Sequence, residues 1–352
     1  MRILPFLGKV IGIKKRLGMK KIVGVLAFVL SGLMFLTPLS AVDIKLGSPL
    51  PEGTVWDTSL RRMADEWRTI TKGRVRVRIY PGGIAGGEGD MIRKMRIGQL
   101  DAGVFSPYGL KVMVPESFTF ILPGLVQTEE ELNALLLRYS PTLEDKFRQA
   151  GFEMLAWSLS GWAYPFSKTP AYFPEDLMQG TMAVDDSEVD LYAALKSLGF
   201  DVEPMPINEI MVGLQSGLVD SMLVPPVAAA AYQWFGLAST MTDVRLTPVL
   251  GGLVLSKRAW RSIPEEYHEE LKASMERVAQ EFTAESERLG NEALRVMLEN
   301  GLEVVPVEEK DLSTWSQFMI QGHELMVGEG KAIPQEFYDA IRTDLEELRR
   351  QG

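Results

Sequence analysis

The segment Glu265–Glu299 reads EEYHEELKASMERVAQEFTAESERLGNEALRVMLE, and it decides the architecture that the sequence predicts. It follows Ser262-Ile263-Pro264, a combination typical of a helix start, and it stops before Asn300-Gly301, which is typical of a helix end. An unbroken helix of these 35 residues would be about 52 Å long at 1.5 Å per residue. Such a helix exceeds the diameter of one small domain. Unless it forms a coiled coil, we expect it to span two lobes.

The chain after residue 42 alternates short strands with amphipathic helices, which is the pattern of an α/β protein. From Trp56 to Ile70, large apolar residues recur at steps of four and three, so they predict one buried helical stripe. Arg74–Tyr80 alternates arginine with aliphatic residues, as a half-buried strand does. Further strands are expected at 43–48, 100–105, 152–158, 181–185 and 218–224, and further helices at 90–97, 128–147, 187–198 and 207–216. No linker interrupts this order, so we expect several strands to join the lobes.

Composition excludes several classes of protein and site. The chain has 352 residues, of which 46% are hydrophobic and 24% charged, as in ordinary globular proteins. It has no cysteine and only two histidines, so disulfides, thiol catalysis and zinc sites rich in cysteine or histidine are not expected. Seven of the 37 basic residues and none of the 47 acidic ones lie in 1–41, so 42–352 carries 30 basic against 47 acidic side chains, a net charge of −17. This acidic body disfavours nucleic-acid binding.

The N-terminal segment 1–41 has the features of an export signal. Its basic start leads into Ile22–Leu36, fifteen residues without a charge, which is within the range of a signal-peptide core but short for a membrane span. Small residues near Ala41 offer a cleavage site, although Leu39 is a poor residue three positions before it. We expect a periplasmic protein that begins near Val42. An uncleaved anchor in the inner membrane stays open, as does a start of translation at Met19.

No arrangement of residues indicates catalysis. The sequence has no GxSxG motif, no HExxH motif and no calcium loop. His268 is expected on a solvated helix face, His323 in a structural role, and Asp185-Asp186 in a turn or at a helix N-terminus. The region 157–235 is rich in aromatic residues, and there is no arginine from Gln149 to Val244. We expect no enzyme, cofactor or metal site, and an apolar cleft lined by some of these aromatic residues.

Several short motifs together carry a family resemblance. They are Lys45-Leu46-Gly47-Ser48 before Trp56, Gly73–Val77 followed by Tyr80-Pro81-Gly82-Gly83, Ile97–Asp101, Pro115–Phe118, Pro174–Leu177, and Leu198-Gly199 with Pro204–Glu209 and Leu214–Asp220. Over nearly all of 43–330, the chain resembles the DctP-like solute-binding subunits of tripartite ATP-independent periplasmic (TRAP) transporters.

The resemblance implies two α/β lobes of the periplasmic-binding-protein fold, joined by hinge strands and by a long helix. We expect lobe I to comprise 42–160 and 248–288, and lobe II 161–247 and 289–352. The resemblance also implies that a small ligand is captured in the cleft between the lobes and is delivered to the membrane permease subunits. An enzymatic activity is not implied.

The ligand-binding positions depart from the family pattern. Family members usually present an arginine that pairs with the substrate carboxylate, in a run aligned here with Asp176–Val184, and Ala183 occupies that position. A second basic position falls near Gly161–Ala163, and a polar segment of the family aligns with Ser221–Val224. Because a carboxylate enclosed without a cation is strongly disfavoured, we expect a hydrophobic or amphipathic ligand. The alignment predicts a cleft wall made of Trp56, Phe105, Tyr108, Trp162, Ala163, Ala183, Met222 and Trp234.

Two alternatives stay open at this point. The first is a conventional carboxylate-binding TRAP protein that uses Lys168 or a helix N-terminus instead of the arginine. The second is an interaction or scaffold protein on the same fold. For the family's arginine-lacking relatives, the resemblance also implies a tetratricopeptide-repeat protein as a partner.

Overall fold

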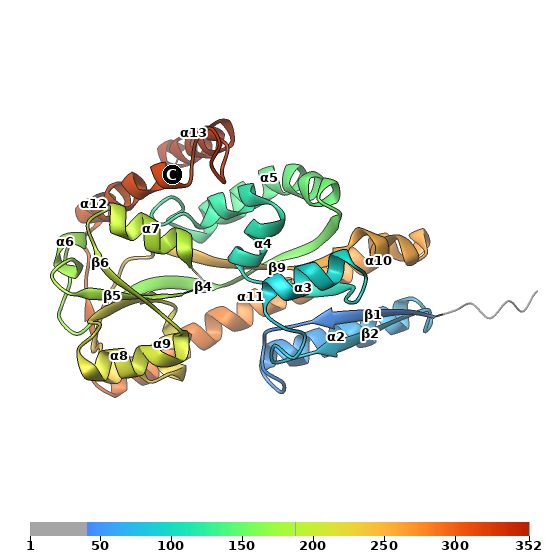
Figure 1. Ribbon diagram of the computed structural model, residues 1–352, viewed down its shortest axis with the longest axis horizontal. Coiled ribbons are helices and arrows are strands. Elements are labelled where there is room, and N and C mark those ends of the chain that lie inside the picture. The colour runs from blue at the N-terminus through green and yellow to red at the C-terminus, as the bar shows by residue number, and fades with distance from the viewer. Residues whose placement is uncertain (1–40, 187, 352) are drawn as a thin grey trace, which may run out of the picture. The chain divides into compact units, whose positions relative to one another are not determined.

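The computed structural model describes residues 41–186 and 188–351, so the predicted export segment lies outside the described residues except for Ala41. The described chain combines a central sheet with helices packed around it (Figure 1), and the predicted α/β class is confirmed. Within the described residues, no helix is both long enough and apolar enough to cross a membrane.

The strands confirm most of the predicted ones. They are β1 (Val42–Gly47), β2 (Val75–Tyr80), β3 (Ala102–Phe105), β4 (Phe152–Ser167), β5 (Thr181–Asp185), β6 (Asp201–Met205), β7 (Ser221–Val224), β8 (Thr240–Thr242), β9 (Thr247–Ser256) and β10 (Glu303–Val305). The strand order is β2-β1-β3-β9-β4-β7-β5-β6, and β8 pairs with both β4 and β10.

Two long central strands, β4 and β9, connect the two ends of this sheet. They pair antiparallel from Phe152 opposite Ser256 to Ala163 opposite Thr247, with register shifts near Met154 and between Leu159 and Trp162. The first half of β4 thus pairs with β9, which pairs in turn with β3, while the last residues of β4 pair with β7 and β8. The sequence predicted this strand to end at Ser158, which is wrong: it continues to Ser167 through Gly161, whose φ is +121°. The predicted lobe boundaries stay a prediction.

The helices surround the sheet and include short 3-10 turns. The α-helices are α2 (Val55–Ile70), α3 (Glu88–Arg96), α4 (Pro107–Met113), α5 (Glu129–Gln149), α6 (Pro174–Leu177), α7 (Val189–Ser197), α8 (Ile210–Ser216), α9 (Pro226–Ala231), α10 (Lys257–Ser262), α11 (His268–Glu299), α12 (Glu309–Ile320) and α13 (Gln335–Gln351). The 3-10 turns are η1 (Pro115–Ile121), η2 (Ile207–Glu209), η3 (Trp234–Gly236), η4 (Glu265–Tyr267) and η5 (Gln321–Leu325).

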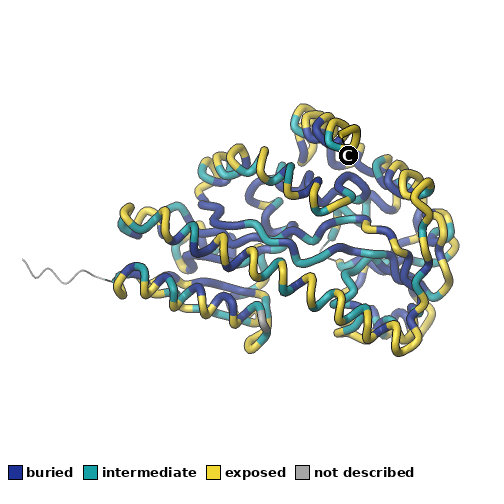
Figure 2. Tube along the Cα trace, turned by 180° about the vertical axis from the view of Figure 1, so that it is seen from behind, coloured by how far each residue is buried: buried dark blue, intermediate teal, exposed yellow. Residues whose placement is uncertain are grey.

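The long helix predicted from the sequence is α11. Its 32 residues give a length of about 48 Å, and the 3-10 turn η4 precedes it where the sequence predicted α-helix from Glu265. It packs against α2, β4 and α9, and it crosses the sheet on the side that faces the viewer in Figure 2. At the α2 contact, the indole N–H of Trp56 donates to Ser286 Oγ at 3.2 Å. His268 does not lie on a solvated face as predicted, because its ring stacks on Trp260 with centroids 4.1 Å apart.

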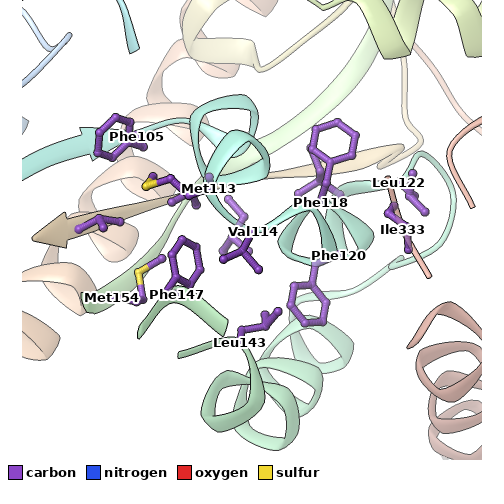
Figure 3. Packing of buried hydrophobic residues seen from close by; sticks show 14 of the residues in the cluster. Phe105, Met113, Val114, Phe118, Phe120, Leu122, Leu143, Phe147, Met154 and Ile333 are labelled. Atoms are coloured by element: carbon purple, nitrogen blue, oxygen red, sulfur yellow. The ribbon is translucent and has the colours of Figure 1, made fainter. Parts of the chain in front are cut away.

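The sheet and the inner faces of the helices are buried, whereas the outer helix faces are exposed (Figure 2). One hydrophobic cluster joins α3, α4, η1 and α5 to β4 and β9. Figure 3 shows its aromatic and methionine side chains interlocking around Val114. Two further clusters form around Met222 and around Met182, on neighbouring strands β7 and β5. These clusters hold the elements that surround the cavity described next.

Candidate functional site

A partly open cavity of about 220 Å³ lies among α4, η1, β5, α7, β7 and β9. Its wall is mostly aliphatic and aromatic. Apolar side chains in it include Phe118, Ile121, Leu191, Ile210, Met222 and Val224. For scale, an engineered cavity of roughly 150 Å³ lined by apolar side chains holds one benzene molecule. This cavity is therefore large enough for a small molecule with a ring-sized or short-chain apolar part.

The floor of the cavity is formed by two parallel strands. Ala183 of β5 pairs with Met222 of β7, and both residues are buried and line the cavity. The methyl side chain of Ala183 occupies little of the space between β5 and α4. In α/β sheets, ligands bind beyond the carboxyl ends of the strands, and β5 ends next to the cavity at Asp185.

Four cavity residues carry polar side chains: Tyr108, Asp185, Glu188 and Thr247. Thr247 is satisfied inside the fold, since its Oγ1 donates to the Ile121 carbonyl at 2.5 Å. Glu188 follows β5 at the start of α7, and its backbone N–H donates to the Asp185 carbonyl at 2.9 Å. The Tyr108 hydroxyl of α4 donates to the Glu188 carboxylate from the opposite wall. Among the described residues that line the cavity there is no lysine, arginine or histidine.

Burial dominates the electrostatics of this polar group. The pKa of Glu188 is raised to about 7, chiefly because burial disfavours the charged carboxylate; the Tyr108 hydrogen bond opposes this shift, and the neighbouring Asp185 charge adds to it. The pKa of Tyr108 lies well above its usual range, because burial and the two nearby carboxylates disfavour a phenolate. At neutral pH, Tyr108 is therefore a hydrogen-bond donor and Glu188 is close to half ionised.

A second polar contact joins the same two helices. Lys111 of α4 forms an ion pair with Asp190 of α7, and its ammonium lies 4.9 Å from the centre of the Phe118 ring. Desolvation lowers the pKa of Lys111. The pair neutralises its own charges, and neither residue lines the cavity.

The structure brings four of the eight predicted cleft residues to this cavity. Tyr108, Ala163, Ala183 and Met222 all line it. They come from α4, β4, β5 and β7, which are distant in sequence and adjacent in the fold.

The other four predicted residues lie elsewhere. Phe105 and Trp234 are 1% exposed and belong to the hydrophobic clusters, where Trp234 stacks on Tyr232. Trp162 is buried beneath the Arg245 guanidinium, which lies 5.6 Å from its ring centre. Trp56 lines a separate cavity of about 30 Å³ next to α11. Large aromatic side chains near strand ends mostly fill the core here.

Sequence reasoning did not identify Glu188 as a cavity residue, and it interpreted Asp185 only as part of a turn. A single glutamate before a helix is a common helix-start signal. What sets Glu188 apart is its hydrogen bond with Tyr108, a residue eighty positions earlier in the chain, and the sequence does not show that the two residues meet. The one available signal was the end of β5 next to Asp185, because such strand ends border ligand sites.

His323 lies outside the cavity wall and makes hydrogen bonds within the fold. His323 is buried, accepts a hydrogen bond from the Tyr338 hydroxyl at Nδ1 and donates from Nε2 to the Pro123 carbonyl, at 2.8 and 2.9 Å. Within the described part of the chain, no group of three or more metal-ligating side chains is assembled.

Comparisons with protein families, with curated proteins and with solved structures all find solute-binding proteins. The model of the family described as "Bacterial extracellular solute-binding protein, family 7" (DctP) matches residues 46–328. A solute-binding protein of Albidiferax ferrireducens is 24% identical over 278 residues, which are 76% of this chain and 80% of that protein.

Solved structures of TRAP periplasmic solute-binding proteins share the fold, which confirms the predicted two-lobed architecture. One from Xanthobacter autotrophicus, with bound β-D-galacturonate, has a TM-score of 0.73 at 20% identity and covers 85% of this chain and 99% of that one. One from Rhodobacter sphaeroides, described as apo and open, has a TM-score of 0.76 at 18% identity and covers 87% and 99%.

Proposed function

The chain belongs to the DctP family, family 7 of the bacterial extracellular solute-binding proteins, and we propose that its ligand is a small hydrophobic or amphipathic molecule held in the cavity at Ala183 and Met222. Proteins of this family are solute-binding subunits of TRAP transporters, not enzymes, and they work with membrane permease subunits. The captured ligand would be delivered to such a permease.

The composition of the cavity wall carries this proposal. A carboxylate ligand such as the galacturonate of the Xanthobacter protein needs a cation or several hydrogen-bond donors when it is enclosed. The described residues around this cavity supply no cation, and they add the acidic side chains Asp185 and Glu188. An anionic ligand would be desolvated and repelled, whereas an apolar one would exchange water for an apolar wall.

The alignment of Ala183 with the family's arginine position supports the same ligand class. The conventional alternative uses Lys168, but that side chain lies 3.1 Å from the Asp220 carboxylate and outside the cavity wall. Lys168 is therefore engaged in a structural ion pair and is a poor substitute for the missing arginine.

Native mass spectrometry of the purified protein, followed by denaturing extraction, tests the proposal. We expect a co-purified apolar or amphipathic metabolite at one per chain. A small organic acid at the same ratio would refute the proposal and favour the alternative, a conventional TRAP protein that binds a carboxylate.

An engineered variant sharpens this test. Ala183→Arg should gain affinity for organic acids in a thermal-shift panel, because a ligand that binds only the folded state stabilises it by mass action. Ala183→Gln, of similar length and without charge, is the matched control and should not gain this affinity. Equal responses of the two variants would contradict the placement of Ala183 beside the ligand.

Two finer features belong to the same proposal. We expect the segment 1–41 to direct export, with either cleavage near Ala41 or retention as an inner-membrane anchor, and N-terminal sequencing of the mature protein decides between them. We also propose a tetratricopeptide-repeat protein as a partner in transport. Co-purification of such a protein with the chain from its native host would support this, and its absence at the transporter would count against it.

A further inference from the structure

Two polar contacts connect α4 with α7 at the cavity. Tyr108 of α4 donates a hydrogen bond to Glu188, the N-cap residue of α7. Lys111, one turn later on the same face of α4, forms an ion pair with Asp190. We propose that these two contacts form a clasp that holds the cavity closed, and that the clasp opens as the pH rises because Glu188 is part of it. This goes beyond the proposed function, since it concerns how the cavity opens and not which ligand fills it.

The two helices of the clasp belong to different ends of the sheet. Helix α4 packs against α3, β3, η1 and β9, whereas α7 packs against β6 and η5. Strand β3 pairs with β9 at one end, and β6 pairs with β5 at the other. Within the described chain, the backbones of α4 and α7 do not pack closely on each other, so side chains make the connection. The clasp can therefore be released without disturbing the packing of either helix on its own strands.

Strand β4 has a feature that would permit such a movement. With β9 it connects the two ends of the sheet, and its register against β9 shifts between Leu159 and Trp162. Gly161 lies within this irregularity with a φ of +121°, an angle that residues with a side chain rarely adopt. Irregularities of this kind bend a strand locally. A change of the bend at Gly161 would move α7 away from α4 and widen the cavity.

Glu188 makes the clasp respond to pH. In the closed cavity the pKa of Glu188 is about 7, chiefly because burial disfavours its charged form. In an open cavity water would hydrate the carboxyl group, and its pKa would return toward the ordinary 4.5. Closing therefore takes up a proton. The resulting advantage of the closed state is complete below pH 4.5 and is lost as the pH rises through 7.

The groups that face Glu188 come from three elements. Asp185 at the end of β5 adds to the rise of its pKa, whereas Tyr108 of α4 opposes the rise through its hydrogen bond. Lys111 of α4 and Asp190 of α7 compensate each other's charge. The described residues of η1, η2, β7, α9 and β9 that line the cavity are uncharged. Within the clasp, Glu188 is thus the group whose pKa is raised into the neutral range.

Pulsed electron paramagnetic resonance measures the opening without a ligand. The chain has no cysteine, so two introduced ones, Ile97→Cys at the end of α3 and Val212→Cys on α8, can carry spin labels. Both positions are exposed, and they lie on the α4 side and the α7 side of the cavity. We expect a shorter and a longer label distance in the dialysed protein. The ratio of the short-distance to the long-distance population should fall by about tenfold from pH 5.5 to 8.0.

Two carboxylate variants assign the pH dependence. Glu188→Gln removes the titrating group and keeps an oxygen that can accept from Tyr108, so its population ratio should change by less than about twofold. The matched control is Glu209→Gln, which removes an exposed carboxylate beside the cavity residue Ile210. It should keep the tenfold change, since its charge is screened by water. Equal loss in both variants would assign the effect to the net charge of the protein and would overturn the proposal.

A third variant tests the ion pair of the clasp. Lys111→Met removes the contact with Asp190 and leaves Glu188 and Tyr108 in place. It should lower the closed population at pH 5.5 and at pH 8.0 by a similar factor, while the ratio between the two pH values stays as in the wild type. A closed population unchanged by Lys111→Met would show that the ion pair is not part of the clasp.

The outcomes separate the clasp from the proposed function. A single label distance at both pH values, in the wild type and in Lys111→Met alike, overturns the clasp. A closed population that grows as the pH rises overturns it as well, because the sign is then wrong. Neither result bears on the ligand class, since the distances are measured without a ligand. An organic acid extracted from the native protein would refute the proposed function and leave the clasp to be decided by the label distances.

Discussion

Two regions of the molecule differ in the partners that they give to a carboxylate. Around α13, the Arg349 guanidinium lies 2.6 Å from one oxygen of Glu131 and 3.0 Å from the other, and the backbone N–H of Gln127 donates to the same carboxylate. At the cavity, Glu188 has a neutral tyrosine as its partner and a second carboxylate as its neighbour. In the first region a cation inside the protein compensates the carboxylate, whereas Glu188 has no basic side chain beside it in the cavity wall and has a raised pKa.

The largest effect on stability that we expect from this comparison is the loss of unfolding free energy when Glu188 ionises. Because burial raises its pKa from 4.5 to about 7 in the folded protein, its favourable contribution is complete below pH 4.5 and is lost as the pH rises through 7. Relative to Glu188→Gln, the wild type should lose about 3 kcal/mol of unfolding free energy between pH 4.5 and 8. Urea unfolding across this range measures the loss, and a constant difference between the two proteins would show that Glu188 is solvated.

His323, near α13, should respond to pH in the opposite direction and by a similar or slightly smaller amount. Desolvation lowers its pKa from 6.5 to about 4, so its contribution is complete above pH 6.5 and is lost as the pH falls toward 4. The loss should approach about 3 kcal/mol. A His323→Gln variant serves as the reference, because glutamine can still donate to Pro123 and accept from Tyr338. The same acid sensitivity in this variant would assign the effect to other groups.

The ion pair at α13 should show the cost of an unbalanced carboxylate directly. Arg349→Met leaves Glu131 buried without a cation, and we expect a loss of about 2 kcal/mol after allowance for the partial exposure of the arginine. In the double variant Arg349→Met/Glu131→Gln, about half of this loss should be recovered. Denaturant unfolding of the three proteins tests the expectation, which fails if the double variant is no more stable than the single one.

The Lys111–Asp190 contact should have the smallest effect on stability. Since Asp190 is 36% exposed and the pair is partly screened, a double-mutant cycle of Lys111→Met and Asp190→Asn should give a coupling of about 0.5 kcal/mol. This pair connects α4 and α7 beside the cavity, so ligand affinity should change along with stability. A coupling near zero would show that these helices are held together by their apolar contacts alone.

Much of the fold could be predicted from sequence periodicity. The stripe from Trp56 to Ile70 forms α2, the segment 181–185 forms β5, and the long helix forms α11. Periodicity failed at β4, where Ser160-Gly161 and Pro165 resemble a turn. Pairing with β9 and β7 holds that segment extended, and this pairing is not visible in the local sequence.

The candidate site was harder to predict than the fold. Alignment with the family predicted eight residues, of which Tyr108, Ala163, Ala183 and Met222 line the cavity. Trp162 and Trp234 came from the same prediction but pack in the interior, because an alignment gives the position of a residue and not the direction of its side chain. Glu188 was missed because the property that sets it apart is its environment, which arises from α4, α7 and β5 together.

Some strands of the sheet pair with strands that are synthesised much later, and this affects how the new chain folds. Strand β3 completes its pairing only with β9, and β8 only with β10, so the chain must be synthesised past residue 256 before the first region is closed and past residue 305 before the second is. Pairing between such distant segments slows folding, since a long loop must close before the contacts form. For a member of a family of extracellular solute-binding proteins, such slow closure would leave the new chain unfolded for longer, which is the state that export before folding would require.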